Sequence, residues 1–344
     1  MNGYRSLRTL FAAGSIVLLL LWLTNISLGS IRIPVPEILG RLMGFSFSKE
    51  SWETIIVHYR LPKSLTAILA GIGLSLSGLQ MQTFFRNPLA GPYVLGISSG
   101  AGLGVALWMM AGAWIPALGA LVGNGPWSLF FSAALGSFVV LLVISLAAWK
   151  VKDSMTLLII GLMFGSFASS IVTLIAYFSE AESLKLYTVW TMGSLGTTGW
   201  TQLLVFMAGT FLGLIPLVLS VKSYNAMLLG ENYAQSMGIS VDRLRWKMII
   251  STGLLTGATT AFCGPIGFIG IAVPHVARLI FRTSDHLTLI AGSAMLGAIT
   301  LLLCDTISQL PGSAQTLPIN VITSFLGAPV VIWLVFKRNV SREF

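Results

Sequence analysis

The sequence predicts an all-α protein that crosses a membrane many times. Its 344 residues are 55% hydrophobic and only 9% charged, which is too little charge to cover a soluble domain. Apolar runs of about 20 residues, the length that a bilayer core requires, recur along the whole chain. These runs are continuous and do not alternate with polar residues, which excludes a transmembrane β-barrel. We therefore expect one transmembrane domain over residues 1–344.

Ten apolar runs are long enough to be membrane spans. The first could pass for the apolar part of a signal peptide, but it extends to Leu28 with no clear cleavage site, so we interpret it as a retained helix. The 36 glycines are expected to let helices pack closely in lipid. The expected spans are 10–28, 63–82, 93–113, 128–149, 155–177, 200–221, 246–263, 264–282, 287–308 and 319–337.

The basic residues predict the orientation. With the N-terminus in the cytoplasm, ten crossings return the C-terminus to the same side. Fourteen of the 20 Lys and Arg residues then lie inside and six lie outside, as the positive-inside rule requires. The net charge of +9 therefore reflects topology, and scattered basic residues without a stripe do not indicate nucleic-acid binding. The six outer residues are Arg32, Arg41, Lys49, Arg60, Lys63 and Lys185.

Two interrupted apolar segments resemble each other at an interval of 186 residues. In the orientation above, 63–82 runs inward and 246–263 runs outward, which is the opposite topology of an inverted transporter repeat. Chance alignment of glycine-rich helices is the alternative. The identities pair Thr66, Leu69, Gly71, Gly78 and Pro88 with Thr252, Leu255, Gly257, Gly264 and Pro274.

The segment 264–282 is expected to be a broken helix. Pro274 interrupts it, and Arg282 follows only eight residues later. At a rise of ~1.5 Å per residue this piece cannot cross a core of ~30 Å. We expect a loop that dips into the protein, followed by a half-helix, because such backbone survives at membrane depth only against protein or a water-filled cavity.

Several motifs of enzymes are absent from the sequence. No lysine follows a glycine, so the chain has no P-loop, and neither an HExxH nor a CxxC pattern is present. We expect no enzyme activity, no cofactor and no metal site. Asp305 is the only carboxylate well inside an apolar run. It is either a polar contact at a helix end or a sign of a proton-coupled secondary transporter.

The largest predicted cytoplasmic loop, about 222–245, contains a short helix. Glu231 suits a first turn, and Gly238 suits a helix stop. This helix is either a plain connector or an exposed element that inserts Tyr233 and Met237 into a groove of a partner.

Long spaced motifs resemble the permease family of binding-protein-dependent ABC importers for iron–siderophores, haem and vitamin B12, the FecCD type. One is GLQMQTFFRNPLAGP at 78–92, followed by Leu95-Gly96 and Gly100-Ala101. Others are WTMGSL at 190–195 and GPIGFIGIAVPHVAR at 264–278, with Asp285-His286 after it. Leu317-Pro318 and Gly327-Ala328-Pro329 complete the pattern, which covers most of the chain.

The resemblance implies a type II importer permease with ten helices per subunit in a bacterial cytoplasmic (inner) membrane. It implies a second permease subunit, most often as a homodimer, with the translocation path between the two. Separate ATPase subunits would bind on the cytosolic side and a substrate-binding protein on the outer side. The substrate would be a metal chelate, by family frequency a ferric siderophore, with haem and cobalamin as the alternatives.

Site residues follow from the same resemblance. Arg60 and Lys63 would pair with acidic residues of the binding protein, a contact that orients docking; anchoring at lipid headgroups is the alternative. The helix that docks into the ATPase would comprise Gly230, Glu231, Ala234, Met237 and Gly238. The translocation and gating residues would be Gln82, Arg86, Asn87, Pro88, Gly267, Gly270, Pro274, His275 and Arg278.

A few positions depart from the family pattern. Relatives often have arginine at the position of Gln309 and an aromatic residue near Val331. They usually have glutamate and glycine at the positions of Thr316 and Asn320. These differences concern the outer contact around the last two helices. His275 is interpreted mainly as a structural residue of the broken helix, and Arg278 as a donor to backbone carbonyls that the proline leaves unpaired.

Overall fold

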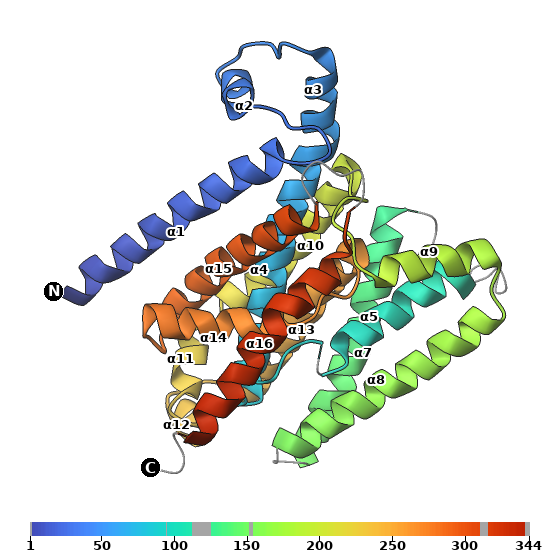
Figure 1. Ribbon diagram of the computed structural model, residues 1–344. Helices are drawn as coiled ribbons and strands as arrows, with labels where there is room; N and C mark the ends of the chain where they lie inside the picture. Colours follow the sequence, from blue (N-terminus) through green and yellow to red (C-terminus); the bar gives the residue numbers. More distant parts are fainter. Residues whose placement is uncertain (1, 94, 112–124, 151–153, 310–315, 341–344) are drawn as a thin grey trace.

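The computed structural model describes residues 2–93, 95–111, 125–150, 154–309 and 316–340, and every regular element in these ranges is a helix. The predicted all-α class is confirmed (Figure 1). The elements are α1 (Asn2–Ser27), α2 (Val35–Leu42), α3 (Glu50–Thr54), the π-helix η1 (Ile55–Arg60), α4 (Leu61–Phe84), α5 (Ile97–Ala106), the π-helix η2 (Leu107–Ala111), α7 (Pro126–Lys150), α8 (Ser154–Tyr177), α9 (Ala181–Thr191), α10 (Trp200–Val218), α11 (Val221–Met227), α12 (Glu231–Ser236), α13 (Val241–Cys263), α14 (Ile269–Phe281), α15 (His286–Ser308) and α16 (Ile319–Val340).

Each expected apolar run contains a helix, although the run 93–113 extends partly outside the described residues. Six helical stretches of the described chain are long and apolar enough to span a membrane, and three apolar helices are shorter. The count of ten crossings therefore stays a prediction. The six stretches are Leu7–Ser27, Glu50–Phe84, Pro126–Ala147, Ile159–Tyr177, Trp200–Val218 and His286–Ser308.

The long helix α13 is not among the six, although its 23 residues equal or exceed the length of all but one of them. Its second half is rich in threonine and glycine, and almost every residue from Met248 to Cys263 is buried. It packs against α4, α7 and α10. A helix enclosed by other helices does not need an apolar surface toward lipid, and small residues let its neighbours come close.

Glycine contacts bring the central helices together backbone to backbone. A Cβ at Gly71 of α4 would overlap the carbonyl of Gly297 on α15. A Cβ at Gly297 would likewise overlap the carbonyl of Gly71. A Cβ at Gly257 of α13 would lie 2.5 Å from the Cα of Ala134 on α7. Because lipid gives helices no hydrophobic reason to associate, such close approach is how they gain packing energy.

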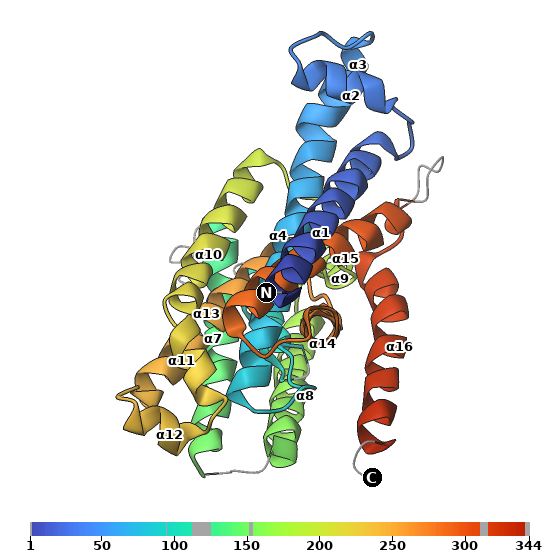
Figure 2. The ribbon, with the colours of Figure 1, turned by 90° about the vertical axis from the view of Figure 1, so that its left-hand side faces the viewer.

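The two ends of the bundle differ, and we name them the α2 end and the α12 end (Figures 1 and 2). The helical stretch Glu50–Phe84 has 35 residues, which is about 50 Å and longer than a bilayer core of ~30 Å. Its first part, α3 with η1, therefore stands beyond the core and forms a lobe with α2. Apolar contacts among Ile26, Ile33, Ile38 and Ile56 fix this lobe to the end of α1.

The helix break near 264–282 is present, but it lies before the expected position. Residues 264–268 are not helical, and α14 then begins at Ile269, so Pro274 lies inside the helix and does not interrupt it. Proline has no N–H, so the carbonyl of Gly270 receives no bond from position 274. That carbonyl lies against Gly78 of α4, where a Cβ would overlap it. The backbones of α4 and α14 are therefore in close contact at this point.

The proposed repeat keeps its opposite directions in the fold. The α4 helix runs from the α2 end to the α12 end, and α13 runs back (Figure 2). The register of 186 residues does not align the helix ends, since Gly78 lies inside α4 whereas Gly264 follows the last residue of α13. The inverted repeat stays a prediction.

Candidate functional site

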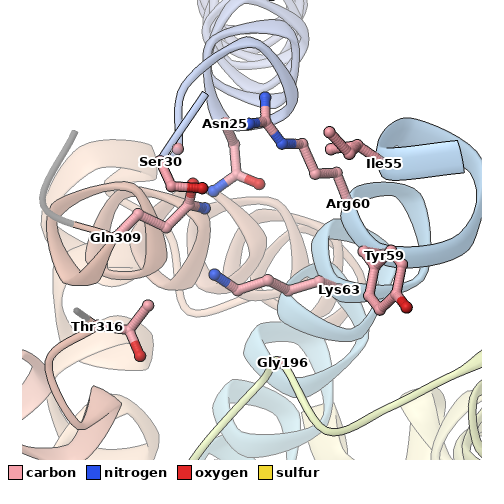
Figure 3. A pocket seen from close by; sticks show the side chains of 10 residues that line it. Asn25, Ser30, Ile55, Tyr59, Arg60, Lys63, Gly196, Gln309 and Thr316 are labelled. Atoms are coloured by element: carbon pink, nitrogen blue, oxygen red, sulfur yellow. The ribbon is translucent and has the colours of Figure 1, made fainter. Parts of the chain in front are cut away.

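A cavity of about 300 Å³ opens at the α2 end and contains both residues predicted to dock a binding protein (Figure 3). Arg60 is only 9% exposed. Its guanidinium donates to the carbonyl of Ile26 at 2.6 Å, to that of Ser27 at 2.9 Å and to that of Ile31. Arg60 therefore caps the last carbonyls of α1, which lack helical partners.

Lys63 forms an ion pair inside the same cavity. Its Nζ lies 3.1 Å from Oδ1 of Asp305, whose side chain is 2% exposed. Asn25 and Gln309 donate to the other oxygen of Asp305, at 2.8 and 2.9 Å. These contacts join α1, α4 and α15, and they match the interpretation of Asp305 as a polar contact at a helix end.

These contacts limit how a binding protein could reach Arg60 and Lys63, but they do not test the predicted docking role. The guanidinium of Arg60 is engaged with backbone, and the Lys63 side chain is 18% exposed. Both line the cavity with Tyr59 and Gln309, so an acidic partner would reach them only by entering it. The docking role stays a prediction.

The loop 264–268 is the place where two of the sequence motifs meet the start of α16. The backbone N–H of Ser194 donates to the carbonyl of Cys263 at 3.1 Å, and the indole of Trp190 donates to that of Ala261 at 3.1 Å. From α16, Asn320 accepts a hydrogen bond from the N–H of Gly267 at 3.2 Å. A Cβ at Gly264 would overlap the carbonyl of Trp190, so the motifs at 190–195 and 264–278 and the start of α16 build one structural unit.

The next predicted residues join α4 to α14. Arg278 donates to Oε1 of Gln82 at 2.5 Å, and Nε2 of Gln82 donates to the carbonyl of Ile271 at 3.1 Å. Arg278 thus bonds to a side chain and not to the backbone carbonyl that we expected, and it orients Gln82 toward the carbonyl of Ile271, one residue after Gly270. Gly270 packs against Pro92, and the half-buried His275 lies one position after Pro274 on α14.

Arg86, Asn87 and Pro88 form the turn after α4. The N–H of Asn87 donates to the carbonyl of Gln82 at 3.1 Å, and its side chain accepts from the N–H of Leu89 at 3.0 Å, a common way for asparagine to shape a turn. Arg86 has a positive φ of 47° and lies at the α12 end. Its guanidinium is 3.9 Å from the carboxylate of Glu231.

The predicted short helix in the loop 222–245 is present as α12. Ala234 is fully buried, whereas Tyr233 and Met237 are 53% and 59% exposed. Gly230 and Gly238, on either side of the helix, have positive φ angles of 113° and 82°, which glycine adopts without strain. The helix therefore turns one small residue inward and two large apolar side chains outward.

Ion pairs hold α12 to the two central helices. Glu231 accepts from Arg245 of α13 at 3.0 and 3.1 Å, and it faces Arg86 from the turn after α4. The carboxylate in the first turn also suits the helix dipole. A displacement of α12 would therefore act on both α4 and α13.

One polar cluster at the α12 end was not predicted as a site. Asn225 of α11 contacts Asp285 and His286 at the start of α15, and His286 reaches Thr83 of α4. The sequence showed Asp285-His286 only as part of a motif. An aspartate just before an apolar run is an N-cap signal, but nothing in the sequence marked Asn225 as its partner. Within the described residues, no three His, Cys, Asp or Glu side chains are grouped to hold a metal ion.

The comparisons with known proteins agree with these motifs and this geometry. The model of the FecCD transport family matches residues 17–337. The chain belongs to the FecCD transport family. The resemblance drawn from the motifs is therefore confirmed.

Two curated relatives are named vitamin B12 import system permease protein BtuC. The protein of Citrobacter koseri is 37% identical over 83% of this chain and 84% of its own length. The protein of Salmonella typhi is also 37% identical, over 83% of this chain and 84% of its own length. A solved structure of a metal-chelate type ABC transporter in an inward-facing conformation is 30% identical, with a TM-score of 0.80 over 96% of this chain and 99% of that one.

Proposed function

We propose that this chain is the membrane-spanning permease subunit of a binding-protein-dependent ABC importer. The observation that carries the proposal is α12, which presents Tyr233 and Met237 outward while Glu231 links it to α4 and α13. The chain has no P-loop of its own, so in this proposal ATP is hydrolysed by separate subunits. An exposed short helix that is linked to two central helices is suited to receive the motion of the separate ATPase subunits.

In this proposal the α12 end is cytosolic and the α2 end faces outward, with both termini inside. Basic residues gather at the α12 end, as the positive-inside rule requires. Lys152 and Arg342, which we also assigned to the inner side, lie outside the described residues. The described basic residues at or next to α11, α12 and α13 are Arg86, Lys222, Arg243, Arg245 and Lys247.

A second permease subunit is part of the proposal, and the exposed face of α8 supports it. Ser166, Ser169, Ser170 and Thr173 form an exposed row on the second half of α8. Three of their hydroxyl groups donate to the carbonyl four residues earlier, and their oxygens can still accept from a partner. Polar side chains within spans usually face other helices or water and not lipid. We infer that this row faces a second copy of the chain across a translocation path.

The proposed substrate is a metal chelate. Family frequency favours a ferric siderophore, and no residue of the motifs distinguishes it from haem or vitamin B12. Vitamin B12, itself a cobalt chelate, is the second candidate because the two relatives above are named for its import. Binding of each chelate to the cognate substrate-binding protein would decide between them.

Uptake in proteoliposomes tests the proposed function. The permease is reconstituted with its ATPase subunits and binding protein, and uptake of the labelled chelate is followed with and without ATP. We expect uptake only when ATP and both partners are present. Uptake by the permease alone, driven by a proton gradient and abolished by Asp305→Asn, would instead show a secondary transporter.

A further inference from the structure

Asn225 joins the short helix α11 to the first turn of α15. Its Nδ2 donates to Oδ1 of Asp285 at 2.7 Å. Its Oδ1 accepts from the backbone N–H of His286 at 2.8 Å and lies 3.0 Å from Nδ1 of the same residue. Only one orientation of the amide meets a carboxylate with its NH₂ and a backbone N–H with its oxygen, so these partners fix the side chain.

His286 extends this contact to α4. The residue is 3% exposed, and its Nε2 lies 3.0 Å from Oγ1 of Thr83, near the last residue of α4. Because Nδ1 faces an oxygen of Asn225 that can only accept, Nδ1 carries a hydrogen. One imidazole ring therefore stands between α11 and the last turn of α4.

Asp285 is both the N-cap of α15 and the acceptor for Asn225. Its second oxygen accepts from the N–H and the hydroxyl of Thr288, at 2.9 and 3.0 Å. Partial burial raises the pKa of Asp285, but the hydrogen bonds from Thr288 and Asn225 lower it to a net value below 3.8. The carboxylate is therefore ionised at neutral pH, and its bond with Asn225 is charge-assisted.

Only three residues, 228–230, connect α11 to α12. Tyr224 packs the inner side of α11 against α4. It is 1% exposed, and its hydroxyl donates to Gln80 of α4 at 3.0 Å. Beyond this point α4 and α15 form a close pair. Gly71 and Gly297 bring their backbones into contact, and Lys63 and Asp305 join them at the α2 end.

We propose that Asn225 is the positioning residue that transmits displacement of α12 to the α4–α15 pair. This inference rests on the proposed importer function. It names the contact through which motion of the ATPases reaches α4 and α15. Because α4 and α15 carry Lys63 and Asp305 at their other end, the same contact couples the ATPase side to the cavity at the α2 end. Coupling between two sites is reciprocal, so events at either end act on the other.

The substitution Asn225→Asp tests the contact by replacing the donor with a second carboxylate. Two ionised carboxylates at this separation repel strongly, so the bridge to Asp285 opens. The exchange variant Asn225→Asp with Asp285→Asn is the matched control. It restores one amide facing one carboxylate, still offers oxygens to His286, and keeps an N-cap residue before α15.

The measurement is the number of ATP molecules hydrolysed per chelate taken up, in proteoliposomes with the ATPases and the binding protein. In Asn225→Asp we expect the number of ATP molecules per chelate to rise about tenfold. This factor corresponds to the free energy of one lost hydrogen bond to a charged group. Binding of the ATPases should be unchanged. In the exchange variant it returns to near the wild-type value. A purely structural role would lower hydrolysis and uptake together.

Thr83→Val provides a second variant that needs no new charge. It removes the hydroxyl that faces His286 and should also raise the number of ATP molecules hydrolysed per chelate taken up. Thr83→Ser should leave this number unchanged. The proposal is overturned if the single variants keep the wild-type value, or if the exchange variant is as impaired as Asn225→Asp. Absence of ATP-driven uptake in the wild type would overturn the proposed function, and this inference with it.

Discussion

Asn320 supplies the hydrogen-bond acceptor for the backbone N–H of Gly267, 3.2 Å away, and so connects the start of α16 to the break before α14. The loop 264–268 leaves the helical pattern at Gly264, with a φ of 75°, and rejoins it after Phe268, with a φ of 66°. Backbone N–H groups in such a loop need partners from outside the helix. Asn320 supplies such a partner for Gly267.

Replacing Asn320 with alanine should destabilise the protein by about 1 kcal/mol, because the N–H of Gly267 loses its acceptor. Asn320→Asp keeps an oxygen in place and is the matched control. Unfolding can be followed with a thiol-reactive dye, since Cys263 and Cys304 are 1% and 0% exposed and react only when the fold opens. Equal unfolding temperatures for wild type and Asn320→Ala would show that the bond does not contribute.

Lys63→Met should cost about 3 kcal/mol, because it leaves the buried carboxylate of Asp305 without its cation. The double variant Lys63→Met with Asp305→Asn removes both charges and should recover most of that loss. The same dye assay measures all three proteins. If the double variant is no more stable than Lys63→Met, the ion pair is not what holds α4 and α15 together at the α2 end.

Gly78→Ala should destabilise the fold by about 3 kcal/mol, because its Cβ would overlap the carbonyl of Gly270 and push α14 from α4. Gly102→Ala is the matched control, since the nearest atom to its Cβ would be 3.6 Å away. Alanine there should be neutral or stabilising by up to about 1 kcal/mol. Similar yields and unfolding temperatures for the two variants would contradict the close α4–α14 contact.

Acidification should weaken the start of α15 through Asp285. Its pKa in the folded state lies below 3.8, so its stabilising effect is present above that value and is lost as the pH falls through the lower, folded pKa. The difference in unfolding temperature between wild type and Asp285→Asn should therefore shrink below about pH 4. A difference that stays constant from pH 7 to pH 3 would show that the carboxylate charge plays no part.

The sequence predicted the helices well because apolar runs and bilayer thickness determine them directly. The short helix α12 was also predicted, since Gly230, Glu231 and Gly238 are local signals. The position of the helix break was wrong by several residues. Proline is tolerated inside membrane helices where neighbouring elements surround the freed backbone groups, and Pro274 lies inside α14 just as Pro216 and Pro329 lie inside α10 and α16.

The polar contacts between helices could not be predicted from the sequence. Arg60 and Lys63 look like exposed basic residues at a helix start, yet one caps α1 and the other pairs with Asp305. Asn225, likewise, has partners 60 and 61 residues away. Such pairings depend on how helices cross, which local patterns do not encode. The resemblance of motifs identified the family but not these contacts.

The most direct test of the central claim is whether the ATPases act through α12. In Tyr233→Asp with Met237→Asp, charges replace two exposed apolar side chains, and the buried Ala234 is untouched. Met43→Asp with Phe45→Asp makes the same change at side chains 78% and 66% exposed in the α2 lobe. We predict that the α12 variant folds but neither binds the ATPases nor supports ATP-driven uptake, whereas the lobe variant still binds them. ATP-driven uptake that persists at the wild-type rate in the α12 variant would contradict the account.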